Sequence, residues 1–164
     1  MTIETERLQI IPLTTRQLDL WTDDIRSLEE ELNCTYAGQP IEGFFYDIVK
    51  KITGIAKSDE DNYLFHTFWF IIRKLDRITV GSASFKGLPN ANSEVGIGYG
   101  LGKAYEGNGY MTETVKAMCQ WAKEHDNISY IIAETEDGNM KSEKVLKRCG
   151  FVFYKKEKNT WWRV

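Results

Sequence analysis

The sequence has few of the residues that build a disulfide-stapled, metal-bound or membrane-spanning protein. Its three cysteines are widely spaced and form no Cys-x-x-Cys pair, which argues against a disulfide framework and against a zinc site. Only two histidines are present, without suitably spaced carboxylates, so we expect no metal. No apolar run approaches the ~20 residues of a membrane span, and the first residues contain no apolar signal segment. We therefore expect a cytoplasmic protein with no membrane partner.

The overall composition is that of an ordinary globular domain. Hydrophobic residues make up 42% and charged residues 27% of the 164 positions, so we expect a single domain spanning residues 1–164. A net charge of −3 gives no general nucleic-acid footprint. The charge is uneven, because residues 139–164 hold 8 Lys+Arg against 2 Asp+Glu. This basic end would suit a polyanionic cofactor, although solvated surface charge is the simpler interpretation for most of these residues.

Hydrophobic periodicity predicts a mixture of strands and helices, and hence the α/β (α+β) class. Residues 57–62 are polar and are expected to form an exposed turn. Strands are expected over residues 7–13, 64–74, 78–86, 94–101, 128–135, 151–155 and 160–163, and helices over residues 14–21, 23–32, 41–56, 111–125 and 140–148.

A glycine-rich turn between a strand and a helix is the first feature that points to a ligand. Gly107 and Gly109 stand between the predicted strand 94–101 and the predicted helix 111–125. Such a turn gathers free backbone N–H groups at a helix N-terminus, where the helix dipole adds about half a positive charge. This arrangement favours an anion, above all a phosphate. The alternative is an ordinary turn whose glycines only supply positive φ.

The strand that leads into this turn has an unusual pattern. Gly96, Gly98 and Gly100 alternate with apolar residues, so one face of the strand carries no side chains there. Glycine weakens a strand, and its repeated use implies that a ligand or a neighbouring element closely approaches that backbone.

The common phosphate and hydrolase motifs are absent. No G-x-x-x-x-G-K-[ST] run is present, which argues against a P-loop nucleotide hydrolase. The glycines of residues 96–102 never satisfy G-x-G-x-x-G, so a Rossmann dinucleotide site is unsupported, and no G-x-S-x-G elbow occurs.

The second half of the chain resembles the GNAT superfamily of acetyl-CoA-dependent N-acetyltransferases. The resemblance rests on Ile97–Leu101, Gly107–Glu113, Asn139–Ser142 and Cys149–Phe151, which occur in that order. The opening Thr5-Glu-Arg-Leu8 also resembles the ribosomal-protein (RimJ/RimL-like) branch. The resemblance implies a GNAT fold, with a mixed central sheet of about six to seven strands, about four to five flanking helices, and splayed central strands that bind CoA.

The resemblance also implies which residues meet acetyl-CoA, the expected co-substrate. Backbone groups near Tyr99 and Leu101 would bind the pantetheine arm, and Asn139 and Ser142 would border the cofactor. Lys141, Lys144, Lys147 or Arg148 could meet a phosphate of CoA. The backbone N–H groups of the turn would surround the pyrophosphate. These groups belong to Glu106, Gly107, Asn108, Gly109, Tyr110 and Met111.

The chain departs from the family at its expected acid–base groups. Many members carry a general-base Glu where this chain has Gly96, and Glu94 lies ~6.5 Å away along the same face. Some members carry a catalytic Tyr where Leu146 stands. Glu94 and Ser142 are therefore the catalytic candidates, with Glu134 as a further polar residue.

A weak base would favour an acceptor amine that loses its proton easily. At pH 7, deprotonation costs roughly 4–5 kcal/mol for a lysine amine and only about 1 kcal/mol for an α-amine. The sequence therefore favours transfer to a peptide or protein N-terminus. The alternatives are a small amine, such as a polyamine or an antibiotic, and a catalytically weak acyl-CoA-binding module. The oligomeric state is open, and a homodimer is one option.

Overall fold

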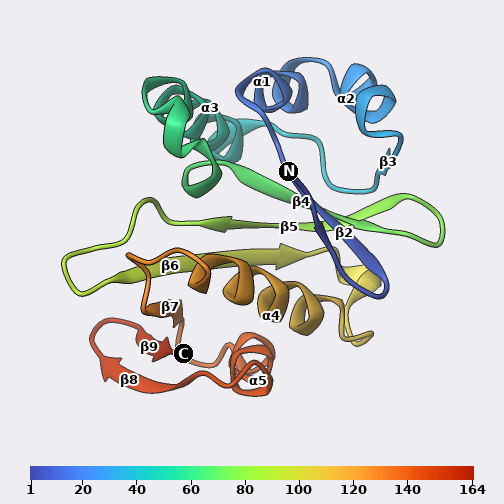
Figure 1. The fold of residues 1–164 in the computed structure, drawn as a ribbon. Coiled ribbons are helices and arrows are strands. Elements are labelled where there is room, and N and C mark those ends of the chain that lie inside the picture. The colour runs from blue at the N-terminus through green and yellow to red at the C-terminus, as the bar shows by residue number, and fades with distance from the viewer.

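The computed structural model describes all residues, 1–164, and builds them around one mixed sheet (Figure 1). The strands follow the order β1-β2-β4-β5-β6-β7-β9-β8, and β3 pairs with β5 off this path. They are β1 Ile3–Glu4, β2 Leu8–Pro12, β3 Thr35–Tyr36, β4 Phe68–Arg73, β5 Ile78–Phe85, β6 Glu94–Leu101, β7 Tyr130–Thr135, β8 Val152–Lys156 and β9 Thr160–Arg163. The helices are α1 Thr15–Asp23, α2 Ile25–Leu32, α3 Gly43–Ser58, α4 Tyr110–Lys123 and α5 Met140–Arg148, with short 3-10 turns η1 Glu60–Phe65 and η2 Lys103–Tyr105.

Helices cover both faces of the sheet. Figure 1 shows α1, α2 and α3 grouped at one side, with α4 lying along β6 away from them. Strand β4 connects the two layers, because its residues alternate between two cores. Trp69 and Ile71 belong to the core under α4, whereas Phe70 and Ile72 belong to the core under α1–α3. All four side chains are fully buried, as the apolar run in the sequence predicts. No helix is both long and apolar enough to cross a membrane.

The sheet opens between β6 and β7. These two strands pair in parallel only where residues 94–96 face residues 130–132. Beyond Gly96, β6 keeps its antiparallel pairing with β5 through Leu101, whereas β7 pairs with β9. The expected splay of the central strands is therefore confirmed, and the open end of β6 leads through η2 into the glycine turn before α4.

The structure differs from the expected elements in two places. The sheet has nine strands rather than six or seven, because the two-residue strands β1 and β3 add to it. Strand β4 begins at Phe68 rather than at residue 64, and the expected turn at 57–62 is divided between α3 and η1. Asp59 accounts for the helical turn that replaces the expected exposed turn and delays the start of β4. Its carboxylate binds Asn62 at 2.9 Å and His66 at 2.9 Å, which holds the chain in a helical turn before the strand begins.

Candidate functional site

The glycine turn presents a row of free backbone donors. Gly107 and Gly109 both have φ of 80°, and Gly109 begins α4 without any side-chain cap. None of the backbone N–H groups from residue 107 to residue 112 donates to an acceptor within the protein. Because these groups lie at the N-terminus of a four-turn helix, their arrangement suits an anion.

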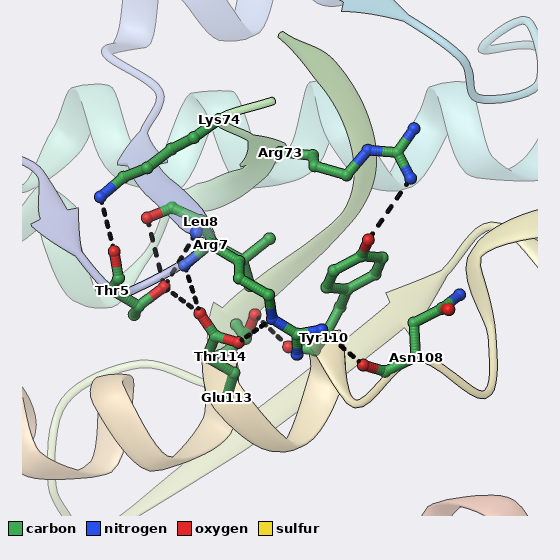
Figure 2. Close-up of polar contacts among 9 residues, drawn as sticks. All are labelled: Thr5, Arg7, Leu8, Arg73, Lys74, Asn108, Tyr110, Glu113 and Thr114. Atoms are coloured by element: carbon green, nitrogen blue, oxygen red, sulfur yellow. Dashed lines mark hydrogen bonds and ion pairs between the residues drawn. The ribbon is translucent and has the colours of Figure 1, made fainter. Parts of the chain in front are cut away.

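The N-terminal segment holds this turn in place, as Figure 2 shows. The guanidinium of Arg7 binds the Glu113 carboxylate at 2.8 Å and the carbonyl of Asn108 at 2.8 Å. Its Cζ atom also lies 4.6 Å from the centre of the Tyr110 ring. The hydroxyl of Thr5 donates to the other Glu113 oxygen at 2.6 Å. The run Thr5–Leu8 therefore fixes both the turn and the first turn of α4.

These contacts keep Glu113 ionised. Burial alone would raise the pKa of its carboxyl group, but the hydrogen bonds from Thr5 and Arg7 outweigh burial and lower the pKa below 4.5. A carboxylate in the first turn of a helix is also stabilised by the helix dipole. Both carboxylate oxygens of Glu113 accept hydrogen bonds from the N-terminal segment, one from Thr5 and the backbone of Arg7, and the other from the Arg7 guanidinium.

A cavity of about 410 Å³ opens beside the turn. The end of β6, the N-terminus of α4 and one side of α5 form its walls. Its lining residues are Tyr99, Gly100, Leu101, Glu106, Gly107, Gly109, Tyr110, Met111, Thr112, Asn139, Lys141, Ser142, Lys144, Val145 and Arg148. Lys141 is paired with Glu106 at 2.6 Å, whereas Lys144 and Arg148 form no ion pair. The cavity therefore combines free N–H groups with unpaired cations.

Tyr99 and Ser142 meet across the splay. The two hydroxyl oxygens are 2.8 Å apart, which joins β6 to the start of α5. The side chain of Asn139 accepts a hydrogen bond from the Ser142 amide and caps α5. Burial raises the pKa of the Tyr99 phenol to about 12, so this group is protonated at neutral pH and can donate a hydrogen bond.

Glu94 lies outside this cavity, at the opposite end of β6. Its carboxylate accepts a hydrogen bond from Asn90 at 3.0 Å and contacts Arg163 at 3.4 Å. The hydrogen bonds from Asn90 and from Tyr154, together with Arg163, lower the pKa of Glu94 even though burial opposes this change. Gly100 lies six residues further along the strand, about 20 Å away at the rise of an extended chain. No contact in the structure brings Glu94 to the cavity.

A second cavity, of about 210 Å³, lies on the side of β6 that faces α1 and α3. Aromatic rings from α1, β3, α3 and β4 line it, and none of its lining residues is charged. These residues are Trp21, Tyr36, Ala37, Gly38, Phe45, Phe70, Thr79, Val80, Gly81, Ser82, Gly100, Leu101 and Gly102. Gly100 and Leu101 line both cavities, so both cavities border the end of β6.

The glycines of β6 serve two different purposes. A Cβ atom on Gly98 would lie 2.6 Å from Cε of Lys86, because the side chain of Lys86 crosses the bare face of the strand. Gly96 lies under the same side chain. A Cβ atom on Gly100, in contrast, would meet nothing within 4 Å. The sequence left a ligand and a neighbouring element as alternatives, and the neighbouring element accounts for Gly96 and Gly98.

Comparison with known proteins identifies this arrangement. The family model of the acetyltransferase (GNAT) domain matches residues 7–152, most of the chain. The chain belongs to the GNAT acetyltransferase family. It is therefore an acetyltransferase that depends on acetyl-CoA.

The alignments with similar GNAT proteins extend over nearly the whole chain. An uncharacterized N-acetyltransferase, YjdG of Bacillus subtilis, is 26% identical over 92% of this chain and 89% of that protein. The structure of a ribosomal-protein-S5-alanine acetyltransferase from Vibrio fischeri superposes with a TM-score of 0.69 at 18% identity, covering 100% of this chain and 96% of that chain. An acetyltransferase from Salmonella typhimurium, described as modifying the N-terminal serine of ribosomal protein L7/L12, gives 0.66 at 16% identity, covering 100% and 98%.

The residues of this GNAT site fit a cofactor that carries phosphates. The free N–H groups of residues 107–112 supply donors, and Lys144 and Arg148 supply positive charge. Gly107 adds no side chain to the space, and a Cβ atom there would meet nothing within 4 Å. A pyrophosphate needs this combination of backbone donors and nearby cations.

Most of the residues that the sequence predicted for the cofactor site lie on the larger cavity. Tyr99, Leu101, Glu106, Gly107, Gly109, Tyr110, Met111, Asn139 and Ser142 all line it. Asn108 does not, because its amide nitrogen turns back to the carbonyls of Tyr105 and Glu106 at 3.1 and 3.3 Å. Lys147 lies away from the cavity, with Nζ 5.4 Å from the centre of the Trp162 ring.

Other residues of the site were not predicted. Thr112 and Val145 line the larger cavity, and neither was among the residues predicted to bind the cofactor. Arg7 lies in the run Thr5–Leu8, which the sequence analysis singled out for its resemblance to the RimJ/RimL branch. Nothing in the sequence indicated that Arg7 holds the glycine turn. Trp21 and Phe70 line the smaller cavity. The sequence placed Trp21 only on a predicted helix and Phe70 only on a predicted buried strand.

Proposed function

We propose that this acetyltransferase transfers the acetyl group to the α-amine at the N-terminus of a peptide or protein. The observation that carries this proposal is that two cavities border the same residues, Gly100 and Leu101, at the end of β6. The larger, with its free N–H groups and cations, suits the cofactor. The smaller, which has no charged lining, suits the acceptor. An amine entering from the smaller cavity would meet the acyl donor at the end of β6.

Particular residues take the cofactor roles in this proposal. The backbone N–H groups from Gly107 through Thr112 bind the pyrophosphate, and Lys144 and Arg148 neutralise phosphate charge. The backbone of residues 99–101 binds the pantetheine arm along the splay, where β6 has no partner on the β7 side. When bound, acetyl-CoA supplies the thioester carbon that the amine attacks. Asn139 keeps α5 in place at the border of this site.

The reaction needs a neutral amine and a stabilised leaving group. The amine nitrogen forms a bond to the acyl carbon, the carbon–sulfur bond breaks, and the amine loses one proton to solvent. The Tyr99 hydroxyl, held by Ser142 at 2.8 Å, can donate a hydrogen bond to the developing thiolate. In this proposal Ser142 positions the Tyr99 hydroxyl. A direct catalytic role for Ser142 stays a prediction.

The surroundings of Glu94 favour an acceptor of low pKa. A general base works best when its pKa is near the operating pH, but the neighbours of Glu94 lower its pKa and hold its carboxylate far from Gly100. An amine would therefore have to lose its proton to water. At pH 7 this costs about 1 kcal/mol for an α-amine and roughly 4–5 kcal/mol for a lysine amine.

Two similar structures agree with an α-amine acceptor. The Vibrio fischeri protein is described as acting on an alanine of ribosomal protein S5, and the Salmonella typhimurium protein as modifying an N-terminal serine. At 16–18% identity these likenesses establish the fold only, so they support the proposal without choosing a protein substrate. A small-molecule amine is the second candidate. The cytoplasmic location and the homodimer stay predictions.

An acceptor assay tests the proposed function. One peptide has a free N-terminus and no lysine, and a matched peptide has an acetylated N-terminus and one internal lysine. Spermidine is the third acceptor. At pH 7 we expect CoA release with the first peptide to be at least ~10-fold faster than with the other two, in line with the cost of deprotonation. Mass spectrometry should locate the acetyl group on the α-amine. Preference for the lysine peptide or for spermidine would overturn the proposal.

A further inference from the structure

The side chain of Lys86 runs along the bare face of β6. Its Cβ and Cγ atoms lie 3.0 and 3.1 Å from the position that a Cβ atom on Gly96 would take. Its Cε and Nζ atoms lie 2.6 and 2.8 Å from the corresponding position on Gly98. The ammonium group is therefore directed along the strand toward Gly100, the residue that borders both cavities.

Lys86 also lies on the side of the sheet that carries the smaller cavity. Ile97 is buried in the core under α4, so the glycines on either side of it face the opposite layer, which α1–α3 cover. On that layer, Ser82 of β5 pairs with Gly100, and both residues line the smaller cavity. Alternate residues of a strand are ~6.5 Å apart, so the ammonium above Gly98 lies about one such step from the cavity.

The ammonium of Lys86 is exposed and has no partner within the protein. Other lysines, such as Lys50 and Lys141, form ion pairs, whereas Lys86 forms none. Glycine inside a strand is unfavourable, and Lys86 is the neighbour that would collide with a side chain at Gly96 or Gly98. A lysine that extends into solvent needs no such space. The two glycines therefore keep one unpaired cation at a defined place beside the smaller cavity.

Charge and position together select a partner for this cation. An ammonium group attracts a carboxylate and repels a second cation. Lys86 lines neither cavity, so it lies outside the uncharged space that suits the first residue of an acceptor. An extended peptide advances ~3.4 Å per residue, so a carboxylate on the next side chain spans the ~6.5 Å step to Lys86.

We propose that Lys86 recognises an acidic side chain at the second position of the acceptor, so that the enzyme prefers N-termini whose first residue is uncharged and whose second residue is Asp or Glu. This proposal rests on the proposed function and names the class of N-terminus that the site takes. The same charge disfavours polyamines and peptides with a basic second residue, because both bring a further cation to Lys86.

Peptides that differ only at the second residue test this proposal. Three lysine-free peptides begin with Ala and continue with Asp, Asn or Arg, and kcat/KM is measured for each at pH 7 and low salt. We expect the wild-type protein to prefer Asp to Asn by about 2- to 5-fold, the range for an exposed ion pair, and Arg to be the poorest. The preference should shrink at ~1 M salt, where the screening length is ~3 Å.

Two variants of Lys86 separate its charge from its packing. Lys86→Met keeps a long stem and removes the charge, so the ratio of Asp to Asn should fall by about 2- to 5-fold. Lys86→Glu should reverse the order and make the Arg peptide better than the Asp peptide, which a loss of packing alone would not do. Each ratio is compared between proteins, so differences in the pKa of the peptide amines cancel.

Two further variants test position. A Cβ atom in Gly98→Ala would displace the far end of the flexible Lys86 side chain, so this variant should fold and should lower the ratio of Asp to Asn with the charge still present. Lys123→Met is the matched control. Lys123 is exposed at the end of α4, on the side of the sheet away from α1–α3 (Figure 1), and its loss should leave the wild-type ratio.

The outcomes separate this proposal from the proposed function. If the wild-type protein acetylates the three peptides equally well, or if Lys86→Glu keeps the wild-type order, the role of Lys86 is overturned and the proposed function stands. A wild-type ratio in Gly98→Ala would overturn the positioning of Lys86 by the bare strand. If spermidine is acetylated and none of the peptides is, both the proposed function and the role of Lys86 are overturned.

Discussion

Glu94 shows why one carboxylate on the right strand is not sufficient for a general base. The sequence predicted it as a catalytic candidate because it lies near the position where many GNAT members carry their base. Asn90, Tyr154 and Arg163 surround its carboxylate, and its pKa is lowered. These partners come from a loop and from the C-terminal hairpin, so no local pattern in the sequence could reveal them. The catalytic role of Glu94 stays a prediction.

The variant Glu94→Gln decides this question. A general base contributes about 10²- to 10⁴-fold to the rate, so its loss would be large. From the distance and the contacts of Glu94 we expect kcat to fall less than about 10-fold. The pH dependence of kcat/KM should keep the shape seen in the wild-type protein. A 100-fold loss of kcat, together with the loss of an acidic limb in that profile, would establish Glu94 as the base.

Trp21 represents the opposite case, a residue whose importance no pattern indicated. In the sequence it is an apolar residue on a predicted helix, which is the usual reading of such a tryptophan. It lines the smaller cavity only because α1, β3, α3 and β4 are brought together around it. A cavity wall shared by four elements is a property of tertiary packing, and sequence periodicity carries no information about it.

Among the elements, the glycine turn and the strand before it were the informative ones. The turn was predicted as an anion site, and its N–H groups are free, as that prediction requires. The alternating glycines of β6 were predicted to lie under either a ligand or a neighbouring element. The structure identifies Lys86 as that neighbour for Gly96 and Gly98. Because Lys86 directly follows β5 and its side chain crosses β6, its position depends on the register between β5 and β6.

The clamp between the N-terminal segment and α4 gives a prediction at this scale. Removing the charge of Glu113 by Glu113→Gln weakens its contacts with Arg7, so we expect the free energy of unfolding at pH 7 to fall by ~1 kcal/mol. The pKa of Glu113 is lowered in the folded state. Its contribution is therefore fully present above its usual pKa of 4.5 and is lost as the pH falls through the lowered value. Urea unfolding of both proteins from pH 7 to pH 3 measures this.

A matched control is Glu157→Gln, which removes an exposed ion pair with Lys155 far from the turn. It should change stability little at any pH. For Glu113→Gln, the difference from the wild-type protein should shrink as the pH falls. A difference that stays constant down to pH 3 would mean that packing, rather than the charge of Glu113, holds the clamp.

For the whole molecule, the sequence predicted the family, the class of fold and the splayed strands. Those predictions depended on motifs in one half of the chain, between the glycine strand and Phe151, where backbone geometry and function are closely tied. The smaller cavity could not be predicted, because residues 20–60 contribute to it without any motif. Its walls come from six separate elements, α1, β3, α3, β4, β5 and β6, and only their packing creates the space.

The central claim is that the free N–H groups at Gly107–Thr112 bind the phosphates of CoA. Calorimetric titration with CoA tests it through Gly107→Trp and the control Gly87→Trp. Both glycines have positive φ, and a Cβ atom on either would meet nothing within 4 Å, so the backbone strain is similar. Only Gly107 lies on the cavity, since Gly87 lies at the other end of β6. We predict that Gly107→Trp abolishes CoA binding while Gly87→Trp keeps the wild-type Kd. A wild-type Kd for a folded Gly107→Trp protein would contradict the account.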